Sequence, residues 1–77
     1  MPLYFFDTRD GDNFIRDDVG EEFPDLETVK KVAVKSLAEL AKEVLPGSAK
    51  RILKVEVRDK RQPIMEACLT FEAILLV

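Results

Sequence analysis

Five aspartates are concentrated in the first eighteen residues, and carboxylates at this density could bind a cation or transfer protons. They are Asp7, Asp10, Asp12, Asp17 and Asp18. A calcium loop needs oxygen ligands at alternate positions, a central glycine and a closing glutamate. In this chain Phe14 stands at the fifth position counted from Asp10, and Gly11 comes too early. Because aspartate and glycine also favour tight turns, we expect turns and caps in this segment and no metal site.

Other reactive groups are scarce. Cys68 is the only cysteine and the chain has no histidine, so a Cys–His nucleophile, a disulfide within the chain and a conventional zinc site are not expected. Carboxylates do acid–base work only where desolvation raises a pKa, and acids in turns are screened by water. The three glycines form no Walker-type or dinucleotide pattern. We therefore predict a non-enzymatic protein with no catalytic residue and no cofactor.

A basic group in the second half of the chain could bind phosphates. Residues 1–27 carry nine acids against two arginines, whereas residues 28–61 carry ten bases against four acids. Aromatic residues that could stack on bases lie elsewhere in the sequence, and the net charge of −3 opposes nonspecific binding to phosphates. Nucleic-acid binding is therefore an alternative function, with the candidate basic surface Lys50, Arg51, Lys54, Arg58, Lys60 and Arg61.

The N-terminal third predicts a short hairpin. The aromatic-rich segment from Leu3 to Asp7 is typical of a strand. The pair Asp10-Gly11 is a strong hairpin turn signal, and residues 14–17 would form the returning strand. A second turn follows at residues 18–21, where Gly20 is free to adopt a positive φ.

One amphipathic helix is the clearest predicted element. Asp25 is a suitable N-cap, and Pro46-Gly47 would end the helix. Leu37 and Leu40 stand in the middle of the expected helix and should be buried. Apolar residues recur every three or four positions and mark one stripe, made of Leu26, Val29, Ala33, Leu37, Leu40, Ala41 and Val44.

Two more strands follow, over residues 51–59 and 64–77. Leu53, Val55 and Val57 alternate with polar residues in the first of them, as expected for a strand with one buried face. The predicted fold is therefore a single α+β domain over residues 1–77, in the order β-β-α-β-β. Its sheet should be mostly antiparallel, with the helix packed on one face.

Self-association is expected because so short a chain has a marginal core. The strand at residues 51–59 is shorter than the run at 64–77, whose residues 73–77 are apolar on both faces. An uncovered apolar patch beside an edge strand is an aggregation hazard, which a symmetric contact removes. The alternative is that the first strand runs beside residues 73–77 and the sheet curls to hide both. We predict a homodimer with the candidate interface residues Tyr4, Phe6, Ile74 and Leu76.

Several short motifs resemble a family of small uncharacterised bacterial proteins. They are Tyr4-Phe5-Phe6-Asp7, the acidic turn Asp10-Gly11, the element Asp17-Asp18-Val19-Gly20-Glu21-Glu22, the helix start Pro24-Asp25-Leu26 and the strand Val55-Glu56-Val57-Arg58-Asp59. The resemblance covers nearly the whole chain. It implies membership of a family of unknown function and supplies no activity or catalytic residue.

A weaker similarity links the chain to antitoxins of the HicB type. These proteins also place a short hairpin before a Pro-Asp-Leu segment and a helix, in a fold related to double-stranded RNA-binding domains. The chain lacks their glycine-threonine step before the helix. The sequence thus favours a self-associating binding or regulatory module in the cytoplasm, without a membrane segment and with a protein partner possible. An antitoxin-like or nucleic-acid-binding module is the alternative.

Overall fold

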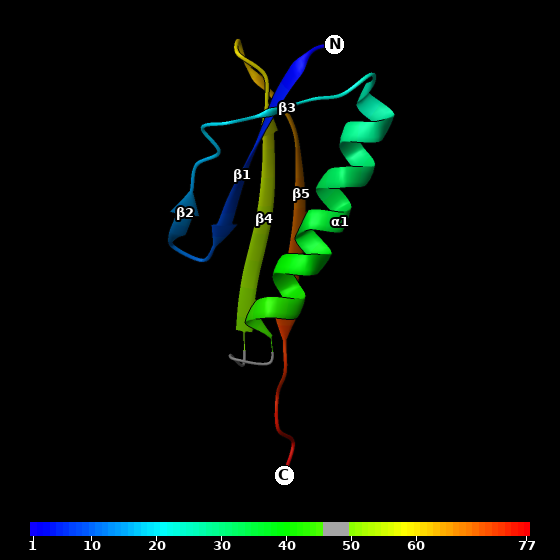
Figure 1. The fold of residues 1–77 in the computed structure, drawn as a ribbon. Helices are drawn as coiled ribbons and strands as arrows, with labels where there is room; N and C mark the ends of the chain where they lie inside the picture. The colour runs from blue at the N-terminus through cyan, green and yellow to red at the C-terminus, as the bar shows by residue number, and fades with distance from the viewer. Residues whose placement is uncertain (46–49) are drawn as a thin grey trace.

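The computed structural model describes residues 1–45 and 50–77 and confirms the predicted α+β fold (Figure 1). One helix packs on one face of an antiparallel sheet. The structure contains one short strand that the sequence did not predict, so the elements follow in the order β-β-β-α-β-β. The elements are β1 (Leu3–Asp10), β2 (Asn13–Ile15), β3 (Glu21–Glu22), α1 (Leu26–Val44), β4 (Lys50–Arg58) and β5 (Pro63–Glu72).

The first strand is the centre of the topology. The sheet order is β2-β1-β4-β5, and β3 also pairs with β1, so that β1 has β4 along one edge and two short strands along the other. Gly11, in the turn between β1 and β2, has the positive φ of 60° that this hairpin requires. The other edge of the sheet is formed by β5, which pairs only with β4 among the described residues.

The helix begins as the sequence predicts. The Asp25 side chain accepts a hydrogen bond from the Thr28 N–H at 2.7 Å, and Leu45 leaves the helix in an extended conformation. The predicted stop at Pro46-Gly47 lies outside the described residues. Leu37 is buried and Leu40 is half-buried against the core. The placement of Leu26 in the buried stripe is wrong, because burial begins one turn later, at Val29.

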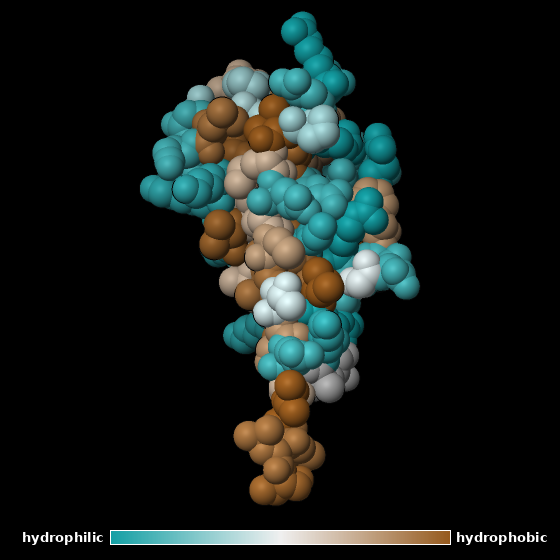
Figure 2. Space-filling view, turned by 180° about the vertical axis from the view of Figure 1, so that it is seen from behind, coloured by the Kyte–Doolittle hydropathy of each residue, from teal (hydrophilic) through white to brown (hydrophobic). Residues whose placement is uncertain are grey.

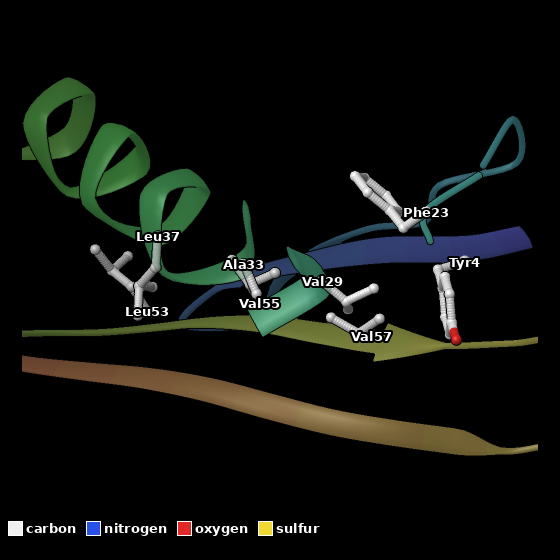
Figure 3. Packing of buried hydrophobic residues seen from close by; sticks show 8 residues of the cluster. All are labelled: Tyr4, Phe23, Val29, Ala33, Leu37, Leu53, Val55 and Val57. Carbon is white, nitrogen blue, oxygen red and sulfur yellow. The ribbon is translucent and has the colours of Figure 1, made fainter. Parts of the chain in front are cut away.

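The core lies between α1 and the middle of the sheet (Figure 3). Leu53, Val55 and Val57 are almost completely buried, as their alternation along β4 predicts. From the helix, Val29 and Ala33 meet them with no exposed surface. Burying a valine or leucine side chain stabilises a fold by roughly 1.5–3 kcal/mol, so this contact supplies much of the folding free energy.

Tyr4 and Phe6, predicted as interface residues, belong to this packed side of the sheet and form no uncovered patch. Tyr4 is 7% exposed, and Phe6 stands opposite Val57, on the helix side of β1. Phe23, in the connection between β3 and α1, packs on both rings, with centroid distances of 6.3 Å to Tyr4 and 5.6 Å to Phe6. The sequence pattern did not reveal this lid because Phe23 lies in neither a predicted strand nor the predicted helix.

The last strand is shorter than the predicted run over residues 64–77. Glu72 pairs with Lys50, which is the first residue of β4, so beyond Glu72 no described neighbouring strand continues the ladder. Residues 73–77 leave the body of the domain as an irregular extension (Figure 1). Ile74 is 70% exposed and Leu76 is 91% exposed. In Figure 2 the extension is a hydrophobic group standing clear of the remaining surface.

Candidate functional site

A buried carboxylate organises the face of the sheet opposite the helix. Asp7 is 5% exposed although its side chain is a carboxyl group. The Arg58 Nε donates to its Oδ2 at 2.9 Å, and the backbone N–H of Asp17 donates to its Oδ1 at 2.9 Å. Arg58 also donates to the carbonyl of Asp17 at 2.8 Å. The expectation that the aspartates lie in water-screened turns is therefore wrong for Asp7, which β1 places beneath the connection that follows β2.

Asp17 ties that connection to the strand. Its carboxylate accepts hydrogen bonds from three backbone N–H groups, those of Phe6 at 3.0 Å, Val19 at 3.0 Å and Gly20 at 3.1 Å. Burial opposes ionisation of Asp17, but these hydrogen bonds outweigh it and lower the pKa. The predicted return strand accordingly ends at Ile15. We call the group formed by Asp7, Asp17 and Arg58 the Asp7 network.

Gly20 and Phe5 complete the packing around this network. The positive φ predicted for Gly20 is confirmed at 76°. A Cβ at this position would come within 2.9 Å of the Phe5 ring, so only glycine fits without displacing the ring. The Arg58 guanidinium also lies over the Phe5 ring, 4.4 Å from the ring centroid. Residues from three separated motifs thus meet in one structural cluster.

Three of the six residues in the predicted basic surface are paired with acids. Arg58 is held in the Asp7 network, Arg51 pairs with Asp10 at 2.6 Å, and Lys54 pairs with Glu66 at 2.9 Å. The hydrogen bond from the Arg51 side chain lowers the pKa of Asp10. This matching of charge by neighbouring carboxylates weakens attraction to phosphates. The remaining members of the predicted surface, Lys50, Lys60 and Arg61, are exposed at the two ends of β4.

An open cavity of about 390 Å³ lies beside the Asp7 network, at the end of β4 and the start of β5. Glu56 and Glu66 stand directly opposite each other there. Each has a cationic partner, since Glu56 accepts from Arg9 at 2.8 Å and Glu66 pairs with Lys54. Among the described residues no group of three or more acidic, cysteine or histidine side chains is arranged to hold a metal ion.

The outer edge of β5 and residues 73–77 form a second candidate surface, which we call the β5 edge. Met65 and Ala67 lie on the helix side and are half-buried, while Leu69 is exposed at the same face. The register places Leu69 opposite Leu53, so the apolar face of the core continues to this edge. Ile74 and Leu76, predicted as interface residues, belong to this surface. The other two predicted interface residues, Tyr4 and Phe6, lie away from it in the core.

Comparison with known proteins identifies the family but no activity. A family model described as a domain of unknown function (DUF6894) matches residues 3–70. No curated protein and no solved structure matches the chain, so the similarity to HicB-type antitoxins gains no support. Within the described residues, the helix is not long and apolar enough to cross a bilayer.

Proposed function

The chain belongs to the DUF6894 family, whose function is unknown, and we propose that it is a non-enzymatic binding or regulatory module that self-associates through the β5 edge. The observation that carries the proposal is the exposed apolar extension next to an unpaired edge strand. Ile74 and Leu76 are more than two thirds exposed, and the backbone groups on the outer side of β5 have no strand partner among the described residues.

Exposed surface of this kind favours association. Covering apolar surface stabilises a complex by roughly 25 cal/mol per Å², and an unpaired strand edge supplies backbone hydrogen bonds to a new neighbour. A small domain gains stability from the same contact, because its single core supplies only a few kcal/mol.

The described carboxylates support a structural and not a catalytic role. A general acid or base needs a pKa near the working pH. Hydrogen bonds instead lower the pKa of Asp10 and Asp17 and keep both ionised. The carboxylates of the open cavity are matched by Arg9 and Lys54.

Light scattering at micromolar concentration tests the proposal. The wild type is expected to have the mass of two chains. Ile74→Asp and Leu76→Asp should each lower the mass to that of one chain, because each change replaces apolar surface of the extension with a charge. Val19→Asp is the matched control, since Val19 is an exposed apolar residue in the loop after Asp17 and should leave the dimer intact.

Circular dichroism of each variant separates loss of association from loss of folding, because residues 73–77 contribute no described contact to the core. A wild-type mass of one chain would refute the proposal. So would a dimer that persists in both Ile74→Asp and Leu76→Asp.

A further inference from the structure

The direction of the chain at the β5 edge limits what can cover it. Residues 73–77 continue in the direction of β5, and they contain neither glycine nor proline to form a tight turn back. They therefore do not cover the edge of their own chain. A second copy paired antiparallel to β5 could cover the edge, because its residues 73–77 would lie beside the start of the first copy's β5.

The faces of the sheet further restrict the arrangement. Met65, Ala67, Leu69 and Phe71 lie on the helix side of β5, as their pairing with β4 shows. Residues directly opposite each other in a ladder project from the same face. A two-fold axis perpendicular to the sheet would lie between the two β5 strands. Helix-side residues of the two copies then lie opposite each other only if the axis is level with a residue, which faces its own copy, and not with the midpoint between two successive residues.

Different axis positions give different neighbours for the apolar extension. An axis at Cys68 places Leu75 opposite Arg61, which lies in the turn before β5. An axis at Leu69 places Glu66 opposite Glu72 of the partner subunit, and directly opposed like charges are destabilising. An axis at Phe71 avoids both, but it leaves Pro63 and Ile64 of β5 without an opposite residue among those described. An axis at Thr70 also avoids both and gives every residue of β5 an opposite residue, and it pairs apolar helix-side residues throughout: Leu69 with Phe71, Ala67 with Ala73, and Met65 with Leu75.

We propose that the partner of the β5 edge is a second copy of this chain, joined by antiparallel β5–β5 pairing about a two-fold axis at Thr70. The inference rests on the proposed self-association and adds its geometry. The two sheets would form one continuous sheet with both helices on the same face. Residues 73–75 of each chain would then lie along Met65 and Ala67 of the other, covering the half-buried side chains that end the core at this edge.

Cysteine cross-linking tests the position of the axis. Only the residue on the axis directly faces its own copy, at a Cα separation of about 4.5–5.5 Å, within the range that a disulfide spans. With the axis at Thr70, the two Cys68 residues would be displaced by four positions, about 13 Å along the strands. Thr70 and Cys68 are both exposed on the face opposite the helix, so access by an oxidant is comparable.

The experiment compares Cys68→Ala/Thr70→Cys with the wild type and with Cys68→Ala/Glu66→Cys under mild oxidation, read as the covalent dimer fraction on a non-reducing gel. The Thr70→Cys variant should cross-link at least tenfold faster than the other two. Faster cross-linking at Cys68 or at position 66 would overturn the inference. A dimer by light scattering without any cross-link would refute the axis but not self-association, whereas a monomer would refute both.

Discussion

Replacing Asp17 by asparagine should destabilise the domain through one identifiable hydrogen bond. The Oδ1 atom accepts from Val19 and Gly20, and an amide oxygen can take over that role. The Oδ2 atom accepts from the Phe6 N–H at 3.0 Å. In asparagine the second position carries an NH₂ group, which cannot accept, so the partly buried Phe6 donor loses its partner.

The expected loss follows from the energetics of charged acceptors. A hydrogen bond to a charged group contributes about 1.5–3 kcal/mol, and an unsatisfied buried donor costs a similar amount. Because Asp17 is partly exposed, water compensates some of the loss, and we expect about 2 kcal/mol. For a domain of this size, that lowers the melting temperature by roughly 8–15 °C.

Urea unfolding followed by circular dichroism provides the measurement, with Asp18→Asn as the matched control. Asp18 has a 79% exposed side chain and pairs only with the exposed Arg16 among its described contacts, so its replacement should cost less than about 0.5 kcal/mol. Equal urea midpoints for Asp17→Asn and Asp18→Asn would refute the reasoning.

The pH dependence gives a second check on Asp17. Its pKa is lower in the folded state than in the unfolded chain, so its stabilising contribution is fully present above the unfolded pKa of about 3.9. That contribution is lost as the pH falls through the lowered folded pKa. The stability difference between the wild type and Asp17→Asn should therefore be large at pH 7 and shrink as the pH falls below about 3.9. A difference that stays constant down to pH 2 would contradict this account.

Two further comparisons test the core and the turns by thermal unfolding. Leu37→Ala should cost about 2–5 kcal/mol because it leaves a cavity in the core, whereas Val34→Ala on the exposed side of the helix should cost less than about 0.5 kcal/mol; similar costs would show the helix register to be wrong. Gly11→Ala should cost about 1 kcal/mol for its positive φ alone. Gly20→Ala should cost clearly more, because its Cβ also meets the Phe5 ring, and equal losses would contradict the close packing described.

The sequence determined the elements whose signals are local. The Asp25 cap, the turn at Asp10-Gly11 and the alternation at Leu53, Val55 and Val57 each predict their structure, because hydrogen bonding to nearby N–H groups and side-chain periodicity act within a few residues. The same signals placed Leu37 in the core. They also showed that residues 73–77 are apolar on both faces, which motivates the proposed self-association.

Only the tertiary structure decided what those elements enclose. Asp7 and Arg58 are far apart in the sequence and become partners because β1 and β4 are neighbours in the sheet. Phe23 covers Tyr4 because the connection after β3 passes over the end of the core. Charge pairs such as Lys54–Glu66 likewise depend on strand register. The sequence lists the charges and rings, but which of them meet depends on long-range strand pairing, whose register no local signal specifies.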